Sequence, residues 1–202
     1  MRNYRAWGVV VLVACNPRAS AVHEEAGAVA TVVPKASPPP ETDFEKLSKL
    51  TTAEQAVAFT KPKMEDPMNK MGSGHALLAL WSVKRLNWVD VAVAKNETTF
   101  ASVLKDAEEA RGKRLCVQGS IVEIEVEKTS EGKVFDGLLH DYARNIYKFS
   151  AVGSSGDLVG GSQSRFCGII TGKFDYSNSG GGTGHAIKLV GMFDLPANKV
   201  AR

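Results

Sequence analysis

Glycine and proline divide this chain of 202 residues into two unlike parts. Seven of the eight prolines lie before residue 68, whereas fifteen of the nineteen glycines lie after residue 111. Proline interrupts regular structure, and glycine between short apolar runs is typical of the turns that join strands. The distribution therefore predicts an N-terminal part with a tether and short helices, followed by a C-terminal β-domain.

From Arg114 onward, short runs in which apolar and polar residues alternate are separated by glycine. Such alternation indicates strands with one buried face. Five strands with a break after the third, here at Gly153–Ser164, have the order of an OB-fold, a small Greek-key barrel. The predicted fold class is therefore α+β, with short N-terminal helices followed by a five-stranded OB-fold-like Greek-key β-barrel. The predicted strands are Arg114–Glu127, Lys133–His140, Asn145–Val152, Arg165–Tyr176 and His185–Leu195.

The first predicted strand changes its inward parity along its length. Leu115 and Val117 share one parity, whereas the apolar residues from Val122 to Val126 share the other. Successive side chains of a strand point to opposite faces, so one extra residue would restore a common inward face. We therefore expect a bulge near Gly119 that turns both sets toward the interior.

The segment 42–110 has the signals of short helices. Two threonines are each followed three residues later by glutamate, which fits the capping box that satisfies backbone donors at a helix start. Because helices this short are marginal alone, we expect the segment to pack on the barrel. The boxes are Thr42-x-x-Glu45 and Thr51-x-x-Glu54, and a further helix is expected from Thr98 or Thr99 to about Ala110.

The first residues have the pattern of an export signal. A short basic start and an apolar stretch too short to span a bilayer end in Leu12-Val13-Ala14-Cys15, which resembles the lipobox of bacterial lipoproteins. The resemblance implies a signal peptide at 1–14, a lipid on Cys15 that anchors the protein to a membrane, and a tether at 15–41. Asn16, in place of aspartate, favours the outer membrane of a bacterial cell envelope. The alternative is an ordinary signal peptide with a chance cysteine.

Several segments of the second half resemble one family. They are similar to bacterial lipoproteins of unknown function that carry a C-terminal OB-fold, sometimes grouped with anticodon-binding-like domains. The resemblance implies an OB-fold domain at 111–196 and no established activity. The segments are Arg111–Cys116, Ala151–Asp157, Arg165–Gly168, Lys173–Asn178 and Gly191–Pro196.

Two cysteines, Cys116 and Cys167, remain once Cys15 is assigned to the lipid. They fall on the first and fourth predicted strands, which are antiparallel neighbours in an OB barrel, and both have outward parity. Disulfides persist in exported proteins, so we predict a bond between them on the barrel exterior. The alternatives are two free cysteines, or metal ligation with His140 or His185, which no short ligand spacing supports.

Aromatic residues are the usual ligand contacts in an OB-fold, because their rings stack on bases or sugars. The parity of Tyr147, Phe149 and Phe174 instead predicts that these three rings belong to the core. The candidate ligand-binding residues are Tyr142 and Tyr176 near strand ends, Lys128 near the first turn and His185 at the start of the last strand.

The remaining features favour a binding role. Glu123, Glu125 and Glu127 share the outward parity of the first strand, where three carboxylates would repel phosphate. The sequence has no recognisable nucleophile, acid–base or phosphate-loop motif, so we expect no catalytic residue, cofactor or metal. We expect a lipid-anchored envelope protein whose barrel is a non-catalytic binding module for an unknown envelope protein or glycan. Nucleic-acid binding is the alternative, and an enzyme with a site between the helices and the barrel is a third hypothesis.

Overall fold

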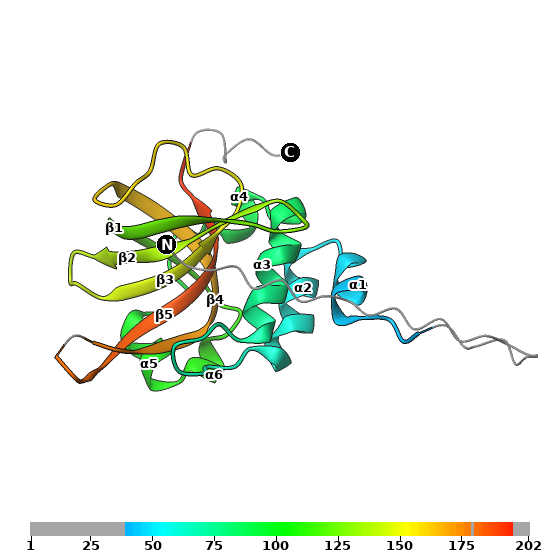
Figure 1. The fold of residues 1–202 in the computed structure, drawn as a ribbon, viewed down its shortest axis with the longest axis horizontal. Coiled ribbons are helices and arrows are strands. Elements are labelled where there is room, and N and C mark those ends of the chain that lie inside the picture. The colour runs from blue at the N-terminus through cyan, green and yellow to red at the C-terminus, as the bar shows by residue number, and fades with distance from the viewer. Residues whose placement is uncertain (1–38, 179, 196–202) are drawn as a thin grey trace, which may run out of the picture. The chain divides into compact units, whose positions relative to one another are not determined.

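The computed structural model describes residues 39–178 and 180–195 (Figure 1). The predicted signal peptide at 1–14, the lipid attachment at Cys15 and nearly all of the tether lie outside these residues. The described residues from Pro40 onward form one compact unit. This unit is an α+β structure, as predicted, in which short helices precede a five-stranded closed sheet. No helix among the described residues is long and apolar enough to cross a membrane.

The helices begin at side-chain caps that the sequence partly predicts. Thr42 forms the predicted capping box with Glu45. The second box begins one residue later than predicted, where Thr52 pairs with Gln55. Thr99 caps a helix as expected, but Asp106 starts a new helix and thereby divides the predicted one. The helices are α1 (Asp43–Ser48), α2 (Ala53–Thr60), the 3-10 turn η1 (Lys61–Lys63), α3 (Ser73–Arg85), α4 (Trp88–Val91), α5 (Phe100–Lys105) and α6 (Ala107–Ala110).

The five strands form one sheet that closes on itself in the order β1-β2-β3-β5-β4. β1 closes the sheet because its first half pairs with β4 and its second half with β2. β3 and β5 run parallel, and the other neighbours are antiparallel. The strand ends lie within two residues of the predicted ones: β1 (Arg114–Lys128), β2 (Lys133–Asp141), β3 (Ile146–Ala151), β4 (Gln163–Ser177) and β5 (Thr183–Phe193).

The bulge in β1 lies three residues beyond Gly119, the expected position. The pairing with β2 shifts between Ile121 and Glu123, so Val122 is the extra residue. Ile121 continues the buried parity of the strand, whereas Val122 and Val126 are 50% and 56% exposed. The expectation that these two valines are buried inside the barrel is therefore wrong. The sheet closes along the first half of β1, and the second half, which pairs only with β2, lies at its rim.

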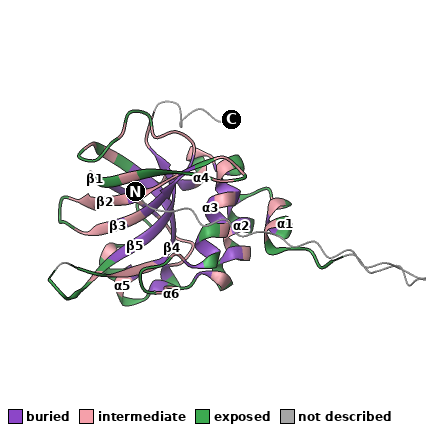
Figure 2. Cartoon of the chain, viewed as in Figure 1, coloured by how far each residue is buried: buried purple, intermediate pink, exposed green. Residues whose placement is uncertain are grey.

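Apolar side chains fill two layers, one on each face of the sheet. Inside the closed sheet, the rings of Phe149, Phe166 and Phe193 pack edge-to-face or tilted with centroids 5.2–5.4 Å apart. On the outer face, residues such as Val190 pack against Leu78 and other side chains of the helices. Figure 2 shows the buried positions gathered in the sheet and on α2 and α3. The helices therefore cover one part of the sheet's outside.

The predicted core aromatics agree with this arrangement in two cases of three. Tyr147 and Phe149 are buried in the interior layer, as predicted. Phe174 is only half-buried, because it lies where the β4–β5 hairpin extends beyond the closed part of the sheet.

Candidate functional site

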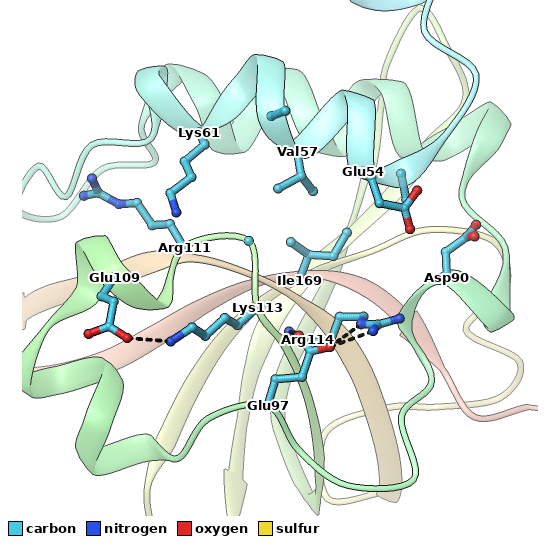
Figure 3. Close-up of a pocket in the computed structure, with 13 residues that line it drawn as sticks. Glu54, Val57, Lys61, Asp90, Glu97, Glu109, Arg111, Lys113, Arg114 and Ile169 are labelled. Atoms are coloured by element: carbon cyan, nitrogen blue, oxygen red, sulfur yellow. Dashed lines mark hydrogen bonds and ion pairs between the residues drawn. The ribbon is translucent and has the colours of Figure 1, made fainter.

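A cleft of about 460 Å³ lies between α2 and the segment that leads into β1 (Figure 3). α2 forms one wall, and residues 109–114, with Glu97, form the other. Ile169 of β4 contributes an apolar floor, and Asp90 of α4 closes one end. The cleft thus combines apolar surface with eight charged side chains.

The wall on α2 is one face of that helix. Glu54, Val57, Ala58 and Lys61 are spaced i, i+3, i+4 and i+7, which places them on a single face. This face carries a carboxylate at its first turn, small apolar groups in the middle and an ammonium group just after its last turn. In Figure 3, the side chains of Glu54 and Lys61 point into the cleft at opposite ends.

Two ion pairs hold the opposite wall in place. Arg114 donates from Nε and Nη2 to Glu97 Oε1 at 2.9 and 2.6 Å, and its backbone N–H donates to Oε2 at 2.7 Å. Burial alone would raise the pKa of Glu97, but the hydrogen bonds from Arg114 outweigh it and hold that pKa below its usual value. Lys113 Nζ lies 2.8 Å from Glu109 Oε1. These pairs fix both charged ends of the wall before any ligand arrives.

A buried ion network lies beside the cleft. Lys188 is fully buried on the outer face of β5, and its Nζ donates to the carbonyl of Glu65 at 2.6 Å and to Asp66 Oδ1 at 3.0 Å. Arg111 Nη2 donates to Asp66 Oδ2 at 2.9 Å. Burial lowers the pKa of Lys188, which its hydrogen bond to Asp66 partly opposes. The network fixes Arg111, whose guanidinium points away from the cleft (Figure 3).

A second polar network lies under α3 and includes a histidine with two hydroxyl partners. His75 is 2% exposed, with Nδ1 2.6 Å from Thr171 Oγ1 and Nε2 2.8 Å from Ser150 Oγ. The Ser150 hydroxyl donates to Asp136, so Nε2 must donate to Ser150 and Nδ1 must accept from Thr171. Asp136 raises the pKa of Glu127, first through a hydrogen bond between the two side chains and second through its negative charge.

The direction of these hydrogen bonds decides what the second network can do. A general base would accept the serine proton, whereas His75 donates to the serine oxygen. Ser150 is also buried. The arrangement therefore satisfies polar groups between α3 and the sheet rather than activating a nucleophile. The sequence offered no partner for His75, because its partners lie 75 and 96 residues away.

The structure places the four predicted ligand-binding residues at three separate turns, and none of them lines the cleft. Tyr142 is 77% exposed beyond the end of β2. Lys128 ends β1, in a hairpin whose turn contacts α3 through Glu131 and Lys84. Tyr176 and His185 both belong to the β4–β5 hairpin (Figure 1).

Tyr176 and His185 lie on opposite faces of their hairpin. Tyr176 is opposite Gly184 and stacks on Phe174 with centroids 6.2 Å apart. His185 is opposite Asp175, with its Nδ1 2.7 Å from Asp175 Oδ1. Because directly paired residues share a face and neighbours alternate, the two candidates cannot contact one ligand from the same side.

The predicted disulfide is confirmed. Cys116 and Cys167 are paired directly between β1 and β4 and are bonded. They lie on the outer face of the sheet, as predicted, but Cys167 is fully buried because the helices cover that face. Because the two cysteines are bonded, both alternatives, free thiols and metal ligation by this pair, are excluded.

The fold and the cleft together define an α+β protein with a closed five-stranded sheet and a ligand-sized cleft beside α2. No protein-family model matches the chain, and no curated protein matches it. A crystal structure of the mitochondrial single-stranded DNA binding protein Rim1 from S. cerevisiae is similar, with 13% identity and a TM-score of 0.31. The match covers 43% of this chain and 97% of that chain. We draw no functional argument from a likeness at this level.

Proposed function

We propose that the closed sheet is an OB-fold. Its strand order, its parallel β3–β5 pair and the dual pairing of β1 support this assignment. The irregular segment between β3 and β4 occupies the position of the break that the sequence predicts.

The protein itself is proposed to be a lipid-anchored, non-catalytic binding module of a bacterial envelope, which binds its partner in the cleft rather than on the face of the barrel. The observation that carries this proposal is the cleft beside α2, where Glu54 and Lys61 form no ion pair with another described residue. Charged groups held apart on a fixed wall are suited to a polar partner, either an envelope protein or a glycan. Cys15, if lipidated, would keep this site at a membrane.

Nucleic acid is the weaker candidate partner. Glu123, Glu125 and Glu127 are exposed along β1, as their parity predicts, and would repel phosphate. The stacked pair of Phe174 and Tyr176 is the one feature that favours a base. Salt-dependent binding of oligonucleotides by the purified protein would support this alternative.

The anchor is tested by localisation. Cys15→Ser should release the protein from the membrane fraction, because the thiol that carries the lipid is lost. Continued attachment of an acylated variant would contradict the lipid assignment.

The binding site is tested by photocrosslinking in cells. A benzoylphenylalanine at Ala58, which lines the cleft, should capture a discrete envelope component, whereas the same group at exposed Val159 should not. Val159 lies between β3 and β4 and does not line the cleft. Equal capture from both positions, or none from Ala58, would contradict the proposal.

A further inference from the structure

We propose that the cleft binds a short extended peptide by its two ends, the ammonium group at Glu54 and the carboxylate at Lys61. This inference rests on the proposed binding function and names the chemistry of its ligand. It follows from three properties of the cleft: the spacing of Glu54 and Lys61 on one wall, the pairing of the charges on the other wall and the apolar surface between them.

The spacing of Glu54 and Lys61 along the helix axis matches the length of a tripeptide. Glu54 and Lys61 are seven residues apart along one helical face, which corresponds to about 10 Å at 1.5 Å per residue. An extended chain advances about 3.3 Å per residue, so three residues span the same distance. A dipeptide is too short to reach both charges, and a much longer peptide must leave one end outside.

The opposite wall leaves the two charges of the α2 wall to set the polarity of the cleft. Arg114 is paired with Glu97 and Lys113 with Glu109, while Arg111 is paired with Asp66 and points away from the cleft (Figure 3). Asp90, at the end near Glu54, adds one further carboxylate.

The charges of α2 remain available to a ligand. Arg114 attracts Glu54 electrostatically, but no hydrogen bond or ion pair joins the side chain of Glu54 or Lys61 to another residue that the structure describes. Glu97 and Glu109, in contrast, already have cationic partners. A zwitterionic peptide would therefore find one free charge of each sign.

Small apolar groups line the middle of the cleft. Val57, Ala58 and Ile169 line the cleft here, and the backbone enters β1 through Gly112, which has a φ of +91°. A Cβ at Gly112 would lie 2.8 Å from Val57 Cγ1, so glycine allows the two walls to approach here. This middle surface suits short aliphatic side chains such as alanine and has no charge to attract a phosphate.

The test uses trialanine with free ends as the probe and the full-length lipidated protein in detergent, with binding followed by NMR titration. Trialanine should bind, and N-acetyl-trialanine amide, which lacks both charges, should not. Dialanine should bind more weakly than trialanine. Glu54→Gln and Lys61→Gln should each weaken trialanine binding by about two- to fivefold, the range of single exposed ion pairs. The matched controls Glu125→Gln and Lys105→Gln, at exposed positions outside the cleft, should leave it unchanged.

Equal binding of the blocked and free peptides would overturn the inference, as would unchanged affinity in both cleft variants. Capture from Ala58 together with no trialanine binding would refute the peptide ligand and leave the proposed binding function standing. If Ala58 captures no component and trialanine does not bind, both the proposed binding function and the peptide ligand are refuted.

Discussion

Burial of His75 predicts a specific dependence of stability on pH. The side chain is enclosed between α3 and the sheet, and burial, reinforced by the positive charges of Lys188 and Lys148, lowers its pKa from 6.5 to about 3. In the unfolded chain the imidazole becomes protonated below about pH 6.5, whereas in the folded protein it stays neutral to about pH 3. The unfolded state therefore binds more protons in this window, and stability falls as the pH falls through it.

The size of the effect follows from the difference between the two pKa values. Each pH unit below 6.5 costs about 1.4 kcal/mol of the free energy of unfolding until the folded-state pKa is approached. Two units below the unfolded value, near pH 4.5, the loss from this one residue is about 2.7 kcal/mol. His75→Gln removes the titration but keeps a side chain that can donate and accept hydrogen bonds. This variant should lose less stability than the unaltered protein over the same pH interval.

Urea unfolding near neutral pH and near pH 4.5 measures how much stability the unaltered protein and the His75→Gln variant each lose on acidification. The difference between these two losses isolates His75 from the carboxylates that titrate in both proteins. The same substitution at exposed His185 serves as the control and should leave most of the loss in place. If His75→Gln loses as much stability on acidification as the unaltered protein, the imidazole is not held neutral and the assignment of its hydrogen bonds is wrong.

Three further predictions concern the covalent bond, the buried ions and one close backbone contact. Replacing Cys116 and Cys167 with alanine opens a link between residues 51 apart, which should cost about 4 kcal/mol and lower Tm by roughly 8–16 °C in calorimetry; an unchanged Tm would contradict it. Asp66→Ala leaves the ammonium of Lys188 buried without its carboxylate and should cost about 3–5 kcal/mol, more than Lys188→Met, which removes the buried charge itself; the reverse order in urea unfolding would refute the reasoning. Gly191→Ala would drive a Cβ into the carbonyl oxygen of Cys167 and should cost about 3 kcal/mol or more; a fully stable variant by the same assay would show that the strands can separate there.

The strands and the disulfide could be predicted because the alternation of apolar and polar residues indicates both where a strand lies and which of its side chains share a face. Cys116 and Cys167 share outward parity, and the structure pairs them directly. The bulge was misplaced because Ile121 and Val122 are consecutive apolar residues. Either could be the extra one, and only the pairing with β2 and β4 decides between them.

The candidate site was not predictable, because parity distinguishes the two faces of a strand but not which face meets solvent. Lys188 has the outward parity of an exposed lysine, yet α3 and the segment before it bury it completely. The spacing of Glu54 and Lys61 on one helical face is visible in the sequence. The wall opposite them comes from residues some forty to sixty positions later, which no local pattern brings to α2.

The second half of β1 has a consequence for how copies of this protein behave when crowded. Beyond Ile121, which still hydrogen-bonds to the backbone of Gly161 and Ser162, β1 pairs with β2 but not with β4, so its other edge can accept a strand from a neighbouring molecule. Glu123, Glu125 and Glu127 line that stretch, and a second copy adding there would bring carboxylates against carboxylates. The same glutamates that disfavour nucleic acid thus protect the rim of the sheet against edge-to-edge aggregation.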